Sequence, residues 1–457
     1  MIAEQSDGAL TPGRGKGALH QVARRFLRLD PPIPDRSESE VQAELSRNYN
    51  WNFLFNMLEG ASYKFGVSFI ASSTILPLFI TKLTPTPLLP IGLIGVIAQG
   101  GWFLPQLFMA RLVGRLPYQK PVVIKLGLLI ERIPCWIIAL SALVAVQNPT
   151  AAMILFLVSY TWLNLGSGSI AVFWQEMVAR IFPPNRRGRL FGLTNFIGGG
   201  LGVLGAGISA QLLASTPFPN NFFYTFLVAA SGIFLSWVLL ALTRETAYTI
   251  TLPHQNNREF FKALPGLLHE DPNFERFFIA RLLLALGGMG AGFITAAALH
   301  RWQVSDGTVG LYTTCVLGGE TVGHMIFGLM GDRFGNKRGL AVGALLSTLA
   351  YSLAWIAPHP SWYFVVFLLQ GAALGAALTA GLTLVMEFGK PAQRPTYIGL
   401  VSTSIGVVST LAPLLGAAFA NLSYGVLFAL SAIISAISFV LLAWWVKEPR
   451  WSKEMAD

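Results

Sequence analysis

Glu320 and His324 are the two side chains of this 457-residue sequence whose types and spacing most directly suggest chemistry. They lie four residues apart in an apolar stretch, so on a helix they share one face. A carboxylate beside an imidazole in a medium of low dielectric is suited to taking up and releasing a proton. The pair therefore predicts a proton site, and the alternative is a polar pair that only satisfies itself between packed helices.

Further ionisable side chains interrupt the apolar stretches, at Glu59, Lys64, Glu131, Arg132 and Arg281. If these stretches cross a membrane, each charge costs roughly 2.5–3.5 kcal/mol on insertion scales and needs an explanation. Glu59 and Tyr63 are one turn apart, which predicts that both face a central cavity, although Tyr63 also suits interface packing. Glu131 and Arg132 are adjacent and about 100° apart around an α-helix. We therefore expect that they do not both face the cavity and that their role is structural.

Uncharged polar and aromatic side chains lie in the same stretches and suggest a wet interior, although each also suits a hydrogen bond between helices. They are Asn56, Gln99, Gln106, Asn164, Gln175, Asn195, Gln370, Trp102 and Trp174. The candidate pathway for substrate and protons is formed by Glu59, Tyr63, Gln99, Glu131, Arg281, Glu320, His324 and Gln370.

The elements that must position these side chains are transmembrane helices. Hydrophobic residues make up 53% of the chain and charged residues 12%, with a mean hydropathy of +0.57, and a water-soluble chain of this length needs more charge on its surface. Crossing a bilayer takes roughly 20 apolar residues per helix. The sequence predicts an all-α protein with twelve such helices, near 51–82, 88–113, 121–147, 150–181, 188–214, 221–243, 273–300, 307–331, 338–357, 361–388, 395–418 and 422–446.

Six helices lie on each side of a polar segment, which predicts two pseudo-symmetric six-helix bundles. The predicted division is a tail at 1–48, a bundle at 49–245, a linker at 246–272, a second bundle at 273–448 and a tail at 449–457. The first 48 residues contain no apolar run resembling a signal peptide, so the first apolar block is expected to remain as helix 1.

Basic residues concentrate in the loops that follow even-numbered helices, whereas the opposite loops carry Lys82 and Arg301. By the positive-inside rule this places those loops and both termini in the cytoplasm, and the protein in the inner membrane. Membrane topology thus accounts for the net charge of +10 better than nucleic-acid binding does. A basic amphipathic segment at 18–29 suits the anionic lipid surface, and a disordered basic tail is the alternative.

The two halves repeat one another. ARLVGRLPYQK at 110–120 corresponds to GLMGDRFGNKR at 328–338, and RRGRLFGL at 186–193 to QRPTYIGL at 393–400. A glutamate, Glu176 or Glu387, stands about 26 residues into the preceding helix of each half. Duplicated halves of this kind are expected of alternating-access transporters.

These residues resemble the signature of the major facilitator superfamily, G-x-x-x-D-R-x-G-x-K/R-K/R. The second copy is complete, with Gly328, Asp332, Arg333, Gly335, Lys337 and Arg338. The first copy is eroded, with Gly114 at the Asp position and Pro117 at the Gly position. The resemblance covers about residues 49 to 448 and implies a secondary transporter that works by alternating access.

The signature also predicts a latch between the halves. An aspartate at the end of helix 8, Asp332, can accept hydrogen bonds from free amides at a neighbouring helix N-terminus, which pseudo-symmetry places at 188–190. Arg333, Glu387 and one of Arg187 or Arg189 would complete a charge cluster when the cytoplasmic side closes. The full gating group comprises Gly328, Asp332, Arg333, Gly335, Lys337, Arg338, Glu176, Glu387, Arg187 and Arg394. The alternative is an ordinary positive-inside loop.

Taken together, the sequence predicts a monomeric secondary transporter of a small solute, coupled to protons. Aromatic content, sparse cavity charge and the lack of an arginine pair for anions favour efflux of an amphipathic compound over uptake of a sugar or organic acid. The sequence has no GxxxxGK[ST], HExxH, paired CxxC or nucleophile elbow, so enzymatic activity, a cofactor and a metal are not expected. The eroded first signature leaves a non-transporting assembly factor or receptor as the other class.

Overall fold

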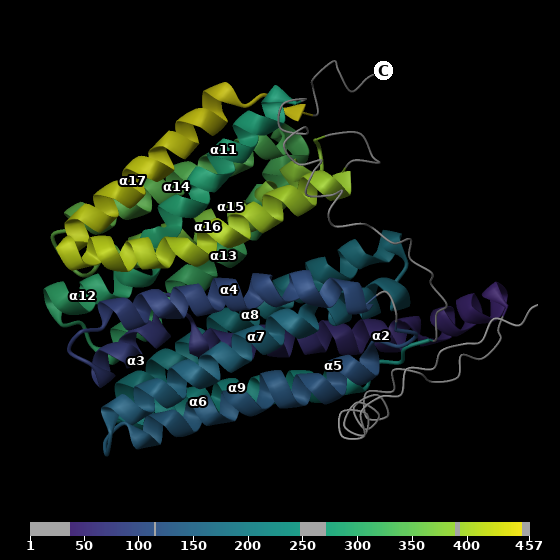
Figure 1. Cartoon of the computed structure of the whole chain (residues 1–457), viewed down its shortest axis with the longest axis horizontal. Coiled ribbons are helices and arrows are strands. Elements are labelled where there is room, and N and C mark those ends of the chain that lie inside the picture. The colour runs from purple at the N-terminus through teal and green to yellow at the C-terminus, as the bar shows by residue number, and fades with distance from the viewer. Residues whose placement is uncertain (1–36, 114–115, 247–270, 389–393, 450–457) are drawn as a thin grey trace, which may run out of the picture.

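The computed structural model describes residues 37–113, 116–246, 271–388 and 394–449, and these residues form helices joined by short turns. Figure 1 shows two bundles side by side, the first drawn in purple to teal and the second in green to yellow. The described helices account for twelve membrane crossings in two groups of six, which confirms the predicted fold class.

In the first half the elements are α2 (Glu38–Val67), η1 (Ser68–Ile70), α3 (Ile75–Leu83), α4 (Leu88–Val113), α5 (Lys120–Gly127), η2 (Leu128–Arg132), α6 (Ile133–Val144), α7 (Pro149–Ile181), α8 (Pro184–Ser215) and α9 (Asn220–Ala241). In the second half they are α11 (Pro272–Gly287), η3 (Gly288–Phe293), α12 (Ile294–Trp302), α13 (Asp306–Phe334), α14 (Asn336–Ile356), α15 (Trp362–Val385), α16 (Arg394–Leu422), α17 (Tyr424–Val440) and η4 (Leu441–Trp445).

Within the described chain, ten helical segments are long and apolar enough to cross a membrane. The two crossings outside this set are α5 to α6, which contains the adjacent charges Glu131 and Arg132, and α13, which carries Glu320 and His324. Both departures from a purely apolar span thus occur where ionisable side chains lie within the apolar stretches.

The first crossing differs from its prediction at both ends of α2. The helix begins at Glu38 and not near residue 51, because the Ser37 side chain accepts a hydrogen bond from the Glu40 amide while Glu40 caps the Ser37 amide. This is a capping box, a strong helix start. The helix then breaks at η1 and resumes as α3, and the seventh crossing breaks in the same way at η3 before α12.

The most extensive contacts between the halves are made by two helix pairs, α4 with α16 and α8 with α13. In lipid, helices associate by close packing of small residues because burial of apolar surface supplies little drive. Gly310 of α13 lies against the backbone of Ala210 on α8, and Gly307 lies against Ala214 in the same pair.

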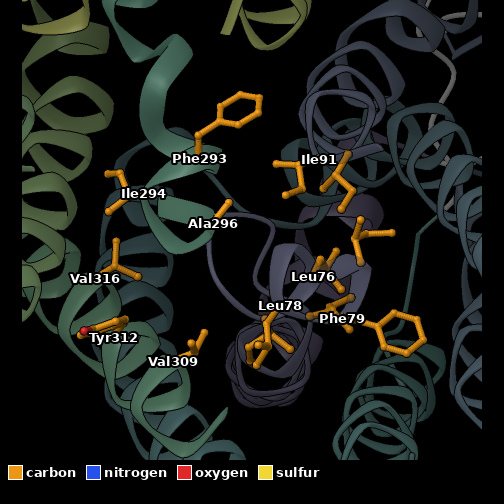
Figure 2. Packing of buried hydrophobic residues seen from close by; sticks show 14 of the residues in the cluster. Leu76, Leu78, Phe79, Ile91, Phe293, Ile294, Ala296, Val309, Tyr312 and Val316 are labelled. Atoms are coloured by element: carbon orange, nitrogen blue, oxygen red, sulfur yellow. The ribbon is translucent and has the colours of Figure 1, made fainter. Parts of the chain in front are cut away.

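One end of the molecule is sealed. Side chains from α3 and α4 meet side chains from η3, α12 and α13 in a single buried cluster there (Figure 2). Polar contacts between the halves lie at the same end: the Thr74 and Thr313 hydroxyls are 2.7 Å apart, and Lys82 pairs with Asp306 at 2.7 Å. We call this the closed end.

Towards the other end of the molecule the halves separate. The close approaches between α8 and α13 run from Gly307 back to Gly199, which touches Thr321 near the middle of both helices. Beyond that point, a methyl group added at Gly188 or Gly192 of α8 would meet nothing within 4 Å. We call this the open end, and it carries the loops that hold most of the basic residues.

Candidate functional site

The candidate site is a cavity of about 230 Å³ in the first half. It is bounded by α2, α4, η2, α7, α8 and α9 and is lined by Asn56, Glu59, Gly60, Tyr63, Lys64, Trp102, Glu131, Arg132, Ser167, Ile170, Ala171, Trp174, Leu190, Phe191, Thr194, Asn195 and Leu240. Its floor is buried, with Glu59 6% and Glu131 5% exposed, whereas Trp102 and Phe191 at its rim are 41% and 38% exposed. The cavity is therefore a charged pocket reached past aromatic side chains.

Glu131 and Arg132 form an ion pair on the floor of this cavity, and both side chains line it. The expectation that the two could not face the same cavity was therefore wrong. Its premise was a regular α-helix, but residues 128–132 form a π-helical turn, in which adjacent residues are separated by a smaller angle. The hydroxyl of Ser167 on α7 donates to the other carboxylate oxygen of Glu131 at 3.0 Å. This pair carries no net charge.

Glu59 is the second buried carboxylate of the floor. One of its oxygens accepts a hydrogen bond from the Ser236 hydroxyl of α9 at 3.2 Å, and the other has no partner among the described residues. No ion pair within 4.0 Å joins Glu59 to a described cation. The Trp174 indole nitrogen, also without a hydrogen-bond partner within the described chain, is the donor nearest in effect to this carboxylate, so the unpaired polar atoms here leave room for a ligand or a proton.

The predicted neighbour of Glu59, Tyr63, also lines the cavity, as expected from their spacing. Lys64 follows on the same helix and lies against Gly198 of α8, near enough to Glu320 of the second half for their charges to interact. Lys64 thus connects the cavity to the interface between the halves.

Glu320 and His324 share a face of α13, as predicted, with Oε1 and Nε2 3.5 Å apart. The other ring nitrogen of His324, Nδ1, lies 2.7 Å from the hydroxyl of Thr379 on α15. Both side chains are about a quarter exposed. The pair lies outside the lining of the cavity, and its role in carrying protons stays a prediction.

The remaining predicted pathway residues do not line the cavity. Gln99 is exposed on α4. Gln370 donates to the Tyr351 hydroxyl at 3.2 Å, and the Arg281 guanidinium donates to the Ala377 carbonyl at 3.2 Å. The hydrogen bonds of Gln370 and Arg281 join helices of the second half. Neither side chain is in the lining of the cavity described above.

The signature residues at the end of α13 lie at the open end. Gly335 adopts a φ of +86°, which L side chains rarely do, and this explains the glycine of the turn. Asp332 and Arg333 are exposed, and Arg338 is exposed on the first turn of α14. Glu387 accepts from the Asn336 side chain at 2.7 Å. The predicted latch belongs to a state in which this end is closed, so it stays a prediction.

The other predicted gating residues make contacts within the first half. Glu176 pairs with Arg180 at 2.9 Å, and the Arg187 guanidinium donates to the carbonyls of Ala179 and Phe182. Gly328 lies 3.9 Å from the Thr379 methyl, measured from the position of an added Cβ. The side chain of Arg394 lies outside the described residues.

Two glutamates that the sequence reasoning missed cap helices at the open end. Glu245, after α9, accepts from the amides of Gln119 and Lys120 at 2.8 and 2.7 Å, and Glu448, after α17 and η4, accepts from the amide of Lys337 at 3.1 Å. Burial raises the pKa of Glu245, and its two backbone hydrogen bonds oppose the shift. The same cap therefore occurs in both halves: a carboxylate that follows the sixth crossing accepts hydrogen bonds from amides at the start of the third crossing, α5 or α14.

A signal for this correspondence was present in the sequence. Arg244 precedes Glu245, and Lys447 precedes Glu448, so a basic residue followed by glutamate stands directly after the last helix of each half.

Comparison with known proteins agrees with this arrangement. The sequence pattern of the Major Facilitator Superfamily matches residues 277–454. A 3-(3-hydroxy-phenyl)propionate transporter of Escherichia coli is 32% identical over 36% of this chain, which is 39% of the relative's own length. An MFS-type transporter of Bacillus subtilis, YfkF, is 24% identical over 60% of this chain and 70% of its own.

Solved structures share the whole fold. The nucleoside transporter NupG superposes with a TM-score of 0.64 at 14% identity, covering 86% of this chain and 100% of its own. A D-xylose-proton symporter superposes with a TM-score of 0.63 at 15% identity, covering 87% and 98%. The second half of the chain thus matches the sequence pattern of the superfamily, and the described chain shares its fold with these solved transporters. As the resemblance drawn from the signature implies, the described chain has two six-helix bundles, and the complete copy of the motif stands at the end of α13.

Proposed function

We propose that the protein is a secondary transporter that moves a small solute through the space between its two bundles by alternating access. The observation that carries this proposal is the pairing of a buried, charged cavity with halves that touch at one end and separate at the other. A membrane protein that only served as a scaffold would have no need of unpaired buried polar atoms facing a cavity. Superfamily architecture adds support, since its duplicated bundles suit rocking about a fixed site.

The direction in which the cavity faces follows from the basic loops. They lie at the open end, so the positive-inside rule places the open end in the cytoplasm and makes this an inward-facing state. Both termini are then cytoplasmic, and the membrane of residence is the inner membrane. In the outward-facing state, Asp332 would meet the start of α8 near Gly188, with Arg333 and Glu387 beside it, as the signature predicts.

Coupling to protons is part of the same proposal. Glu59 in the cavity and the Glu320 and His324 pair at the interface are the buried or half-buried groups able to bind a proton on the path. Lys64 lies between them. Protonation of Glu320 would weaken its charge interaction with Lys64, which joins α2 of the first half to α13 of the second.

Spin-label distances in lipid bilayers test alternating access without any substrate. In a background with Cys135 and Cys315 replaced by alanine, one pair of labels at Leu89 and Leu422 reports on the closed end. A second pair at Arg189 and Phe334 reports on the open end. We expect two populations, in which a longer distance at the closed end accompanies a shorter distance at the open end.

A disulfide supplies the matched control. The Thr74 and Thr313 hydroxyl oxygens are 2.7 Å apart, close enough for the double change Thr74→Cys and Thr313→Cys to form a bridge of roughly 2.05 Å. The oxidised variant should retain only the inward-facing population, and reduction should restore the second. If each pair of labels gave a single distance that changed neither with the disulfide nor with pH, the result would contradict transport and favour a receptor or assembly factor.

A further inference from the structure

The charged side chains that line the cavity are two carboxylates and two cations, but neither cation forms an ion pair with Glu59. Glu131 is neutralised by Arg132, with which it forms an ion pair. Lys64 faces Glu320 across the interface between the halves. Glu59 is 6% exposed and has one hydroxyl donor, Ser236. Arg132 and the Trp174 indole lie near enough to attract its carboxylate, but Arg132 forms its ion pair with Glu131, and one oxygen of Glu59 has no hydrogen-bond partner within the described chain.

A buried carboxylate without a cation is costly in a membrane, unless a ligand or a proton supplies the positive charge. The fixed groups thus leave room for one positive charge beside Glu59 and none for a second negative charge. An anionic substrate is unfavourable for the same reason, because its charge would add to the buried negative charge of Glu59.

We propose that the substrate is a small aromatic organic cation whose ammonium group pairs with Glu59. This inference rests on the proposed transport function and specifies its substrate class. Trp102 and Trp174 line the same cavity, and the faces of tryptophan rings attract cations and stack on other aromatic groups.

The size of the cavity narrows the class further. Pockets that hold drug-sized ligands measure roughly 300–1,000 Å³, whereas this cavity measures about 230 Å³. One aromatic ring with a short charged arm fits this space, and a compound with several fused rings does not. Trp102 and Phe191 line the cavity and are partly exposed, so such a molecule can reach the floor past these two side chains.

Proton and organic cation then compete for one carboxylate. The other titratable or charged groups that line the cavity are Tyr63 and Lys64 on the helix of Glu59, and Glu131 and Arg132 on the π-helical turn. From α9 the group that faces Glu59 is the neutral hydroxyl of Ser236. Exchange of a proton for a cation at Glu59 would couple the movement of one to the opposite movement of the other.

Binding of two matched probes to the full-length protein in detergent tests the inference. At neutral pH, 2-phenylethylammonium and 3-phenylpropionate have the same ring and nearly the same length but opposite charge. By calorimetry we expect the cation to bind at least about tenfold more tightly, the ratio expected when one charge-assisted contact is gained. Its affinity should fall as the pH is lowered, because protons occupy Glu59.

Two variants locate the contact. Glu59→Gln keeps the size of the side chain and should reduce cation affinity about tenfold while removing its dependence on pH. Glu38→Gln makes the same chemical change at an exposed position of the same helix and should bind as the wild type does. If Glu59→Gln is not monodisperse, Glu59→Asp, which keeps the charge, should retain the preference for the cation.

Tighter binding of 3-phenylpropionate, equal binding of both probes, or no binding of either to protein that unfolds cooperatively would overturn the inference. None of these outcomes would affect the spin-label result, which needs no ligand. Conversely, a protein that binds the cation through Glu59 but keeps one fixed conformation would retain this inference and lose the transport proposal.

Discussion

Gly310 of α13 is the position where a single methyl group should move the conformational equilibrium most. A Cβ added there would lie 2.3 Å from the Cα atom of Ala210 on α8, whereas ordinary contacts begin at 3.4 Å. The added Cβ atom and the Cα atom of Ala210 both belong to packed helices, so neither can move alone. The halves would have to separate by about 1 Å at the closed end, and close packing resists this separation.

The expected cost follows from this geometry. Overpacking of this kind destabilises a packed contact by about 1–3 kcal/mol, and Gly310→Ala places that cost on the inward-facing state alone. The equilibrium should therefore shift towards the outward-facing state by about 5- to 150-fold. The pair of spin labels at Leu89 and Leu422 measures this shift directly as a gain of the longer distance.

The same helix supplies two controls for Gly310→Ala. Gly318→Ala adds a methyl group where nothing lies within 4 Å, and it should leave the populations unchanged. Gly319→Ala would approach the Leu368 carbonyl within the second half at 2.2 Å, so it should lower thermal stability without selecting a state. If Gly310→Ala and Gly318→Ala gave the same distance distributions, the assignment of this contact as the seal would be refuted.

Three further substitutions have distinct expected effects. Glu245→Ala should lower stability against thermal unfolding by about 1–2 kcal/mol, because it removes a cap that accepts two backbone amides. Lys82→Met should shift the populations by less than about fivefold, since the pair with Asp306 is 36% and 17% exposed and pairs of this kind contribute about 0–1 kcal/mol. Glu131→Gln should lower stability by about 3–5 kcal/mol, because it leaves a buried arginine without its carboxylate.

Each of these has a matched comparison. Glu38→Ala changes an exposed glutamate and should leave the unfolding temperature as it is, so an equal loss there would argue against the cap at Glu245. Exchange of Lys82 and Asp306 should restore wild-type distances. Ser167→Ala removes only the hydroxyl that donates to Glu131, and a loss as large as that of Glu131→Gln would show that the ion pair is not the main contribution.

The crossings were predictable because their signal is local. Apolar blocks of the right length, separated by polar turns, placed α4 at 88–113 to the residue and most other helices within a few residues. The start of α2 was missed although its capping box is readable at Ser37 and Glu40, because the polar first turns of that helix carry no apolar signal.

The site was harder to predict because it depends on helix geometry and on contacts distant in sequence. Glu59 and Tyr63, one turn apart on a regular α-helix, both line the cavity of the first half, while their place on a central path stays a prediction. At Glu131 the same assumption failed, because a π-helical turn leaves no obvious mark in the sequence. The isolation of Glu59 depends on where Arg132 and Ser236 lie in space, and spacing alone contains no such information.

The breaks in the first and seventh crossings have a consequence for how this molecule can change over evolutionary time. The Thr295 hydroxyl of α12 donates to the carbonyl of Ser73, in the irregular stretch between η1 and α3. That acceptor belongs to the main chain, so any residue type at position 73 supplies it. This part of the closure between the bundles therefore constrains the side chain at 295 but not the one at 73, so position 73 can matter for closure without looking constrained when sequences diverge.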